Sequence, residues 1–353
     1  MQSRFTHLLM QWHLRHNTRS MPWKGEKDPY KIWLSEVILQ QTRVAQGLAY
    51  YERFIQAYPT VQQLAAAPDQ EVFKRWEGLG YYNRCRNLLF TAREITQQRD
   101  GKFPDTYEDI LALKGVGPYT AAAIASFAYD LPYAVLDGNV FRVLSRFFGI
   151  DEPVDAAGGK ILFGRLAEEM LYKKQPGQYN QAIMDFGAVI CTPFSPACHT
   201  CPLQTGCAAF AEGRVNELPV KEKRLERKRR WFYYFLFENN GRLLVHERRA
   251  KDIWQNLYEF YLVETEDAVH WNETAVKQWL AQQLGINKVV VTGISPVQVQ
   301  QLTHRQVKGQ FIRVRLDAIP TSLSKYRWVR GKEMSTLPFP RFITQYLEIS
   351  GMR

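Results

Sequence analysis

Four cysteines that crowd into one short run near the middle of the chain are the first candidates for chemistry. Cys191, Cys198, Cys201 and Cys207 are spaced C-x6-C-x2-C-x5-C and are four of the five cysteines in 353 residues. Thiols so placed indicate one shared site, either a metal centre or a disulfide framework. The uneven outer spacings favour a [4Fe–4S] cluster over zinc, because structural zinc sites usually pair two C-x2-C units. The N-terminal stretch has no apolar run typical of a signal peptide, so disulfides rank last.

A buried carboxylic acid is the second candidate. Asp28 and Pro29 suit the start of a helix, and the apolar residues between Ile32 and Leu39 cover nearly its whole circumference. Glu36 lies among them, and burial raises the pKa of a carboxyl group until it can donate a proton near neutral pH. A carboxylate that caps or pairs within the core is the alternative, and it is favoured on this segment alone.

A glycine turn between two helices is the third candidate. In LALKGVGPYTAAAIASFAY one helix ends at Leu113, Gly115 and Gly117 lie in a tight turn, and Pro118 begins the next helix. Glycine permits positive φ, and the backbone N–H groups at a helix N-terminus attract a phosphate. The pattern predicts a helix–hairpin–helix at about residues 108–128 that binds the DNA backbone, with a plain turn as the alternative.

Asp137, in VLDGNV, is a second acid that could take part in chemistry. It stands where a helix N-cap stands, and capping alone explains an aspartate there. A protonated acid and an ionised one also form the pair that glycosidic cleavage requires, because that reaction passes through a cation-like sugar. Whether Glu36 and Asp137 meet is a question for the structure.

Net charge and paired aromatics favour a nucleic-acid partner. The chain carries a formal charge of +11, and it has no apolar stretch as long as the ~20 residues of a membrane span. We therefore expect a cytoplasmic protein with a polyanionic partner, nucleic acid before a membrane surface. In GLGYYNRCRNL, Tyr81 stands near Arg84 and Arg86 and could wedge into a base stack, although core packing is the commoner use of such tyrosines.

The length suggests two domains. Residues 1–215 read as helical, because apolar residues recur at three- and four-residue steps in 32–44, 72–76, 88–95, 121–127, 140–148 and 161–171. VNELPVKEKRLERKRR predicts an exposed basic linker at 216–229. From 230 to 353, short β-rich runs such as WFYYFLFE, RLLVHERR and FIRVRLDAI alternate with two helical stretches, which predicts a mixed α/β domain.

Taken in order, these motifs resemble the helix–hairpin–helix DNA glycosylase superfamily, and within it the MutY-type adenine DNA glycosylases. The resemblance rests on MPWK, WLSEVILQQT, GLGYY, LKGVGPYTAAAI, VLDGNV, QAIMDFGAVICT and the four-cysteine loop. It implies a mainly α glycosylase domain with an iron–sulfur loop at 191–207, followed by an α/β Nudix-like domain. It also implies a bacterial, nucleoid-associated monomer that works in base excision repair. Its partner would be double-stranded DNA, from which it releases adenine mispaired with 8-oxoguanine or, more weakly, guanine.

The resemblance assigns roles to single residues of this sequence. Glu36 resembles the acid that protonates the adenine, and Asp137, with Asn139 near it, resembles the carboxylate that stabilises or captures the sugar cation. Tyr119 stands where endonuclease III-type relatives place a Schiff-base lysine, so we expect a monofunctional enzyme that leaves the strand intact. The residues implied to surround the flipped adenine and the oxidised guanine are Arg19, Trp23, Lys24, Gln40, Gln41 and Tyr81.

The C-terminal domain resembles the Nudix-like module that reads 8-oxoguanine, with two departures. The metal-binding R-E-x-x-E-E helix is absent, so we expect no pyrophosphohydrolase activity. The lesion-contacting loop has Leu302, Thr303 and His304 where relatives often carry Phe-Ser-His, which keeps a hydroxyl but loses a phenyl ring. In the helical domain, Phe141 replaces a lysine through which some relatives trap DNA, so trapping should be weak.

Two other functions are alternatives at this stage. An endonuclease III-like glycosylase and AP lyase on oxidised pyrimidines would share the cysteine loop and the hairpin, but Tyr119 and the second domain argue against it. A nucleotide pyrophosphohydrolase fused to a DNA-binding helical domain is opposed by the missing glutamate helix.

Overall fold

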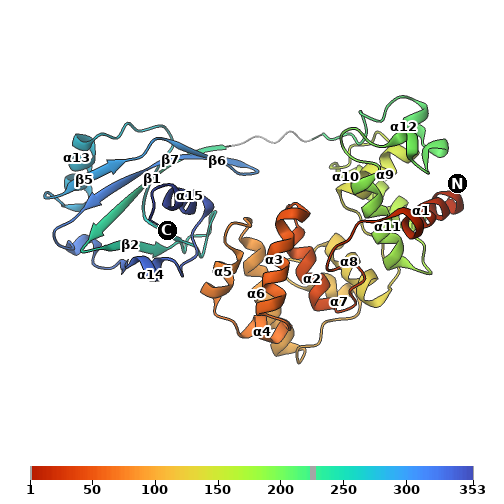
Figure 1. Cartoon of the computed structure of the whole chain (residues 1–353), viewed down its shortest axis with the longest axis horizontal. Helices are drawn as coiled ribbons and strands as arrows, with labels where there is room; N and C mark the ends of the chain where they lie inside the picture. The colour runs from red at the N-terminus through yellow and green to blue at the C-terminus, as the bar shows by residue number, and fades with distance from the viewer. Residues whose placement is uncertain (1, 223–227, 353) are drawn as a thin grey trace. The chain divides into compact units, whose positions relative to one another are not determined.

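The structure is a computed structural model that describes residues 2–222 and 228–352, with only the backbone of residues 2 and 3. Its contacts divide the chain into two compact units. The first contains Met1–Ala66 and Arg86–Lys223, and the second contains Ala67–Cys85 and Arg224–Arg353. Figure 1 follows the elements of both units along the chain by colour. None of the helices in the described ranges is long and apolar enough to cross a membrane.

The first unit is built of helices, as the sequence predicts. They are α1 (Gln2–His16), α2 (Pro29–Leu39), α3 (Val44–Ala57), α4 (Val61–Ala66), most of α6 (Asn83–Gln98), α7 (Tyr107–Ala112), α8 (Pro118–Tyr129), α9 (Gly138–Phe148), α10 (Ala157–Met170), α11 (Pro176–Val189) and α12 (Ala208–Ala211). Two 3-10 turns, η1 (Cys198–Thr200) and η2 (Gln204–Gly206), lie in the cysteine loop.

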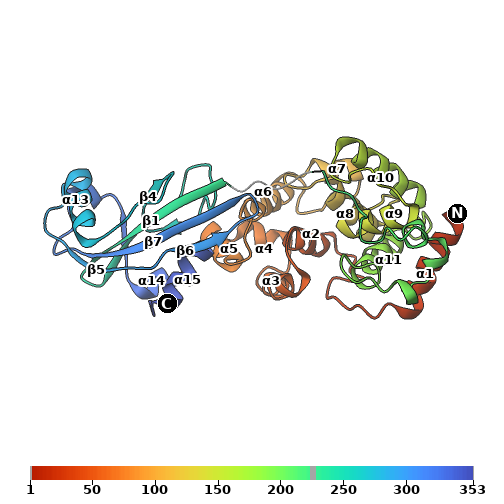
Figure 2. The same cartoon turned by 90° about the horizontal axis from the view of Figure 1, so that it is seen from above.

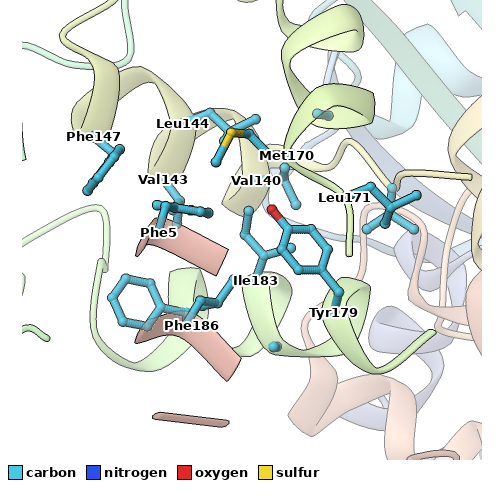
Figure 3. Packing of buried hydrophobic residues seen from close by; sticks show 14 of the residues in the cluster. Phe5, Val140, Val143, Leu144, Phe147, Met170, Leu171, Tyr179, Ile183 and Phe186 are labelled. Carbon is cyan, nitrogen blue, oxygen red and sulfur yellow. The ribbon is translucent and has the colours of Figure 1, made fainter. Parts of the chain in front are cut away.

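One hydrophobic core fixes the helix that follows Asp137. Helices α1, α9, α10 and α11 contribute most of its buried side chains. Figure 3 shows ten of these side chains gathered between the helices: Phe5, Val140, Val143, Leu144, Phe147, Met170, Leu171, Tyr179, Ile183 and Phe186. Helix α9 ends at Gly149, whose φ of 70° is a left-handed conformation that glycine adopts without strain. Packing along the whole of α9 therefore fixes the position of its first residues, which follow Asp137.

The glycine turn predicted between residues 113 and 118 is present. Helix α7 is capped at Leu113, and α8 begins at Pro118. Gly115 has a φ of 83°, and a Cβ atom there would lie 2.7 Å from the Cβ of Asn87, so the turn packs tightly against α6. Around Gly117 a Cβ would meet no atom within 4 Å, which leaves that side of the turn open.

The helical pattern predicted across residues 32–44 is interrupted. Helix α2 ends at Leu39 and α3 begins at Val44. Between them Gln41 has a φ of 57°, and the Nε2 of Gln40 donates to the Oγ1 of Thr120, 3.2 Å away. A single continuous helix was the wrong prediction here, because the break lies among polar residues that apolar periodicity does not register.

The second unit centres on an eight-stranded sheet with the path β3-β2-β1-β7-β5; β4 also pairs with β1, β6 with β7 and β8 with β2. The strands are β1 (Lys228–Asn239), β2 (Arg242–Glu247), β3 (Tyr258–Glu259), β4 (Tyr261–Thr265), β5 (Val290–Ile294), β6 (Gln298–Gln301), β7 (Arg305–Arg315) and β8 (Arg327–Val329). The helices are α5 (Asp69–Trp76), α13 (Glu273–Leu284), α14 (Gly331–Met334) and α15 (Arg341–Ile349), with a short 3-10 turn η3 (Thr321–Leu323). Strands β1 and β7 run parallel, side by side in Figures 1 and 2.

The mixed α/β character of this unit is as predicted, with two additions. Strand β6 was not predicted, and it forms a hairpin with β7 whose tip carries residues 302–304. Strand β1 begins at Lys228, inside the stretch predicted as a basic linker, while residues 223–227 of that stretch lie outside the described residues.

Candidate active site

Glu36 lies in a helix that is buried almost all round, as its sequence predicts. The buried residues of α2 are Tyr30, Ile32, Trp33, Leu34, Ser35, Glu36, Val37 and Ile38, and Glu36 is only 6% exposed. Burial raises the pKa of Glu36 to about 7. A hydrogen bond from the hydroxyl of Tyr119 lowers this pKa, and the charge of Asp137 raises it. The group can therefore hold a proton at neutral pH and give it up to a base.

Asp137 both caps a helix and faces the other acid. Its Oδ1 accepts hydrogen bonds from the backbone N–H groups of Asn139 and Val140, each at 2.8 Å, and its Oδ2 accepts one from the Nδ2 of Asn139 at 2.7 Å. Burial raises the pKa of Asp137, while these donors and the Arg142 guanidinium lower it. The charges of Asp137 and Glu36 interact, and Tyr119 interacts with both. The structure thus brings together the four residues predicted for catalysis.

Arg142 is a member of this site that the sequence did not reveal. It is 8% exposed, and its Nη2 donates to the Oδ1 of Asn139 at 2.9 Å and to the carbonyl oxygen of Gly187 at 2.6 Å. Its Nε donates to the carbonyl oxygen of Cys191 at 2.7 Å. A Cβ at Gly187 would lie 2.7 Å from the Cβ of Asn139. The hydrogen bond from Arg142 therefore holds the Asn139 side chain beside Asp137. Glycine at position 187 leaves the room that Asn139 occupies.

Asp185 is a second residue that the sequence did not single out. Its side chain is fully buried and binds Arg19 Nη1 at 2.7 Å, Asn17 Nδ2 at 2.8 Å and Lys24 Nζ at 3.1 Å. Burial alone would raise the pKa of Asp185, but the hydrogen bonds from Asn17 and Arg19 and the charge of Lys24 more than offset it and lower the pKa. The two cations predicted near the adenine thus share one buried anion.

The other residues predicted near the DNA bases occupy separate positions in the first unit. Trp23 packs edge-on against Tyr51, with ring centroids 5.2 Å apart. Gln40 reaches Thr120 in the first turn of α8, next to Tyr119. Gln41 is exposed on the turn between α2 and α3.

The four cysteines lie in one neighbourhood of the first unit. Cys191 interacts electrostatically with Cys198, Cys201 and Cys207, and all four thiols are free and partly buried. Burial raises the pKa of Cys198 and Cys207 and raises that of Cys201 to about 12, so four thiolates would need a cationic centre to offset their desolvation. Arg146 Nη1 lies 3.5 Å from the Cys191 Sγ. Within residues 2–222 and 228–352, no group of three or more His, Cys, Asp or Glu side chains is placed to hold a metal ion, so the ligand set stays a prediction.

In the second unit, the two adjacent tyrosines have different surroundings. Tyr82 is buried and stacks on Phe73, whereas Tyr81 has a φ of 49° and is 41% exposed. The Tyr81 hydroxyl hydrogen-bonds to the Oγ1 of Thr303. Thr303 lies at the tip of the β6–β7 hairpin, and a hydrogen bond of 2.8 Å from the Leu302 N–H to the Arg305 carbonyl oxygen closes this tip. The core reading is thus right for Tyr82, and the exposed Tyr81 meets the loop predicted to contact the lesion.

Comparison with known proteins places the chain in a family. Residues 34–157 match the HhH-GPD superfamily of base excision DNA repair proteins, and residues 233–348 match the NUDIX domain. An adenine DNA glycosylase from Buchnera aphidicola subsp. Schizaphis graminum is 34% identical over 270 residues, which cover 76% of this chain and 77% of the relative. The chain belongs to the adenine DNA glycosylase family. A human adenine DNA glycosylase is 41% identical over 211 residues, 57% of this chain and 38% of the relative.

Solved structures of glycosylases share the fold of the helical part. A thermostable thymine-DNA glycosylase has a TM-score of 0.55 and 28% identity, covering 60% of this chain and 97% of its own. A non-covalent endonuclease III–DNA complex has a TM-score of 0.52 and 21% identity, with 60% of this chain and 98% of the other covered. The matched superfamily segment, 34–157, contains Glu36, Tyr119 and Asp137, so the candidate catalytic residues lie inside the part that defines the family.

Proposed function

We propose that the chain is a base excision repair enzyme that hydrolyses the N-glycosidic bond of adenine mispaired with 8-oxoguanine or guanine in duplex DNA. Membership of the adenine DNA glycosylase family supports the reaction class and the base. The observation that carries the chemistry is a buried carboxyl group, Glu36, whose pKa is raised to about 7 beside a second acid, Asp137.

Glu36 is the proton donor in this proposal. Its protonated carboxyl group gives a proton to a ring nitrogen of the adenine, N7, so that the base leaves as a neutral molecule. The bond from the base nitrogen to the sugar breaks with its electron pair on adenine, and the sugar becomes an oxocarbenium ion. Asp137, ionised and held by Asn139, stabilises that cation until water adds to the sugar and releases a proton.

Tyr119 keeps the reaction monofunctional. Burial and the neighbouring acids raise the pKa of Tyr119 well above its usual range, so the side chain remains a phenol. A phenol forms no Schiff base with the sugar, so the enzyme has no amine at this position with which to cleave the strand. The hydroxyl instead donates to Glu36 and helps to orient it.

DNA contacts are proposed for four groups of residues. The open side of the turn at Gly117, ahead of the α8 N-terminus, suits a phosphate. Gln41 and Tyr81 are exposed, and an exposed side chain can enter a base stack. Arg19, Trp23 and Lys24 are proposed to border the flipped adenine, and the loop of Leu302, Thr303 and His304 to contact the 8-oxoguanine.

We propose that the chain consists of a glycosylase domain at 1–215, a basic linker at 216–229 and a Nudix-like recognition domain at 230–353. The net charge of +11 supports binding of a monomer to duplex DNA and residence on the nucleoid of a bacterial cytoplasm. No pyrophosphohydrolase activity is proposed for the second domain, because its sequence lacks the R-E-x-x-E-E helix.

Cys191, Cys198, Cys201 and Cys207 are proposed to ligate a [4Fe–4S] cluster. They offer only thiolate donors, as such clusters prefer, and they lie close enough to interact with one another. When bound, the cluster supplies metal–thiolate bonds that order the loop against the helices. Purified protein should contain about four iron and four sulfide per chain, whereas a single zinc per chain would replace this assignment by a zinc site.

Single-turnover assays on three substrates separate the candidate functions. They are a duplex with A opposite 8-oxoguanine, a duplex with thymine glycol opposite A, and free 8-oxo-dGTP. We expect adenine release from the first alone, with strand breaks only after alkali. Alkali-independent cleavage, or release of thymine glycol without release of adenine, would overturn the proposal in favour of the endonuclease III-like lyase. Hydrolysis of 8-oxo-dGTP alone would favour the pyrophosphohydrolase.

A further inference from the structure

Three arginines of the second unit, two of them distant in sequence, converge on the carboxylate of Asp252. Arg230 binds both of its oxygens, with Nη1 2.9 Å from Oδ1 and Nη2 2.6 Å from Oδ2. Arg248 Nη2 lies 3.0 Å from Oδ2, and Arg305 Nη1 lies 2.7 Å from Oδ1. We call these four residues the Asp252 cluster. Both carboxylate oxygens are therefore engaged by guanidinium groups, which fits a structural anchor better than a ligand for a cation.

The cluster is firmly tied to the body of the sheet. Arg230 lies in β1 and binds Glu264 of β4 through its Nε at 2.5 Å. Arg248 follows β2 directly, is 8% exposed and binds Glu259 of β3 at 2.7 Å. Arg230 and Arg248 thus tie Asp252 to the sheet, and Arg305 is the third arginine of the cluster.

Arg305 connects the cluster to the hairpin that carries residues 302–304. It is the first residue of β7, directly after His304. Its carbonyl oxygen accepts the 2.8 Å hydrogen bond from Leu302, while its side chain reaches Asp252. The N–H of Lys228 donates to the carbonyl oxygen of His304 at 3.2 Å, so β1 fixes the same end of the hairpin. The backbone pairing with β1 and the Arg305 side chain on Asp252 therefore both anchor the base of this hairpin tip.

We propose that Asp252 is a positioning residue that, through Arg305, fixes the 302–304 hairpin and thereby sets the preference of the enzyme for adenine opposite 8-oxoguanine over adenine opposite guanine. This inference rests on the proposed function, because it takes residues 302–304 as the lesion-contacting loop. It adds a residue outside that loop, Asp252, as a determinant of the preference between the two mispairs. Asp252 touches neither substrate nor reacting atoms, so its removal changes discrimination and leaves the catalytic step intact.

The test is a double-mutant cycle read out as a substrate ratio. Single-turnover excision rates are measured at sub-saturating enzyme on an 8-oxoguanine:A duplex and on a G:A duplex. The variants are Asp252→Asn, Arg305→Gln and the double variant, with Asp267→Asn as the matched control, since Asp267 is exposed in the same unit and the change removes the same charge. Thermal unfolding of each variant accompanies the rates.

We expect Asp252→Asn and Arg305→Gln each to lower the ratio of the excision rate on 8-oxoguanine:A to that on G:A by about tenfold, because the reaction on the 8-oxoguanine duplex becomes slower. A loss of this size is typical of two residues that are coupled through one charge-assisted contact. The double variant should be no worse than either single variant, because both break that link. Asp267→Asn should keep the wild-type ratio. Arg305→Gln leaves Arg230 and Arg248 on Asp252, so it decides the question even where Asp252→Asn folds poorly.

The outcomes separate the inference from the proposed function. A wild-type enzyme with no preference for 8-oxoguanine:A would refute the proposed function of the loop. A wild-type preference that survives in Asp252→Asn and Arg305→Gln would refute the inference alone. Equal losses on both duplexes, or additive losses in the double variant, would also overturn it, since they would indicate general destabilisation or separate roles.

Discussion

Acids in the interior and near the surface are held in different ways in the two units of this molecule. In the helical unit, Glu36 and Asp137 interact with each other, and burial raises the pKa of both. In the second unit, Asp252 faces three arginines. Burial by itself would raise the pKa of Asp252, yet its hydrogen bonds from Arg230, the Ile253 N–H and Arg305 lower that pKa well below its usual range.

Acidic side chains therefore serve two purposes in this chain. An acid that is buried among apolar groups, as Glu36 is, holds a proton that it can release to a base. An acid that is buried with cations stays ionised and fixes the groups around it. Asp185, which lies in the helical unit but binds Arg19 and Lys24, belongs to the second class. The surroundings of an acid, and not its unit, therefore decide its role.

The largest effect is expected from removing the proposed proton donor. Glu36→Gln keeps the size of the side chain but cannot donate a proton, so adenine excision should fall by about a thousandfold or more. Binding to the 8-oxoguanine:A duplex should remain, as a gel-shift titration can measure. Glu52→Gln, an exposed change on α3, is the control and should keep the wild-type rate. Excision retained in Glu36→Gln would remove this residue from the acid role.

Loss of the second acid should have the next largest effect. Asp137→Asn keeps a side chain that can cap α9, so the fold should persist. It removes the charge that is proposed to stabilise the sugar cation, which should slow single-turnover excision by about a hundredfold. A rate equal to that of the wild type, with normal thermal unfolding, would mean that Asp137 only caps the helix.

For an acid that is paired with cations, we expect its substitution to lower the stability of the fold. Asp185→Asn leaves the cations Arg19 and Lys24 without their buried anion, and the free energy of unfolding should fall by about 3 kcal/mol. Asp130→Asn breaks an exposed pair with Lys27 and should cost less than about 1 kcal/mol. Denaturant titration of both variants makes the comparison. Equal small losses would show that the Asp185 site is no structural anchor.

The smallest effect should come from Tyr119→Phe. The hydroxyl of Tyr119 lowers the pKa of Glu36, so its removal should raise that pKa and move the pH dependence of excision toward higher pH. The rate at low pH should change by only a few-fold, about what one hydrogen bond contributes. An unchanged pH midpoint would show that the two side chains are not coupled.

Local sequence patterns were enough to predict much of this site. The apolar residues around α2 predicted the burial of Glu36, and Asp137 before a helical stretch predicted an N-cap. The glycine turn before Pro118 was found where expected. Each of these features depends on residues a few positions apart, where helix periodicity and capping chemistry apply.

Contacts between distant residues could not be predicted in this way. Arg19 and Asp185 are separated by 166 positions, and Arg305 and Asp252 by 53, and no spacing rule links such pairs. Strand β6, with the sequence QVQQ, has no apolar alternation and is a strand because β7 provides its partner. These features arise from tertiary packing, which a single sequence does not encode in any local pattern.

The raised pKa of Glu36 has a consequence for stability as well as for rate. Between the ordinary value of 4.5 and about 7, the folded state holds a proton on Glu36 that the unfolded state has lost. Stability should therefore fall as pH rises through that window, and Glu36→Gln should remove this part of the slope.

The decisive measurement is the pH profile of single-turnover adenine excision from an 8-oxoguanine:A duplex with enzyme below saturation, because this profile reports the pKa values of the free enzyme. If protonated Glu36 is the acid, the rate is constant at low pH and declines as pH rises through about 7, the pKa of that group. The decline should approach about tenfold per pH unit. A rate that stays constant or increases as pH rises through this value would contradict the account.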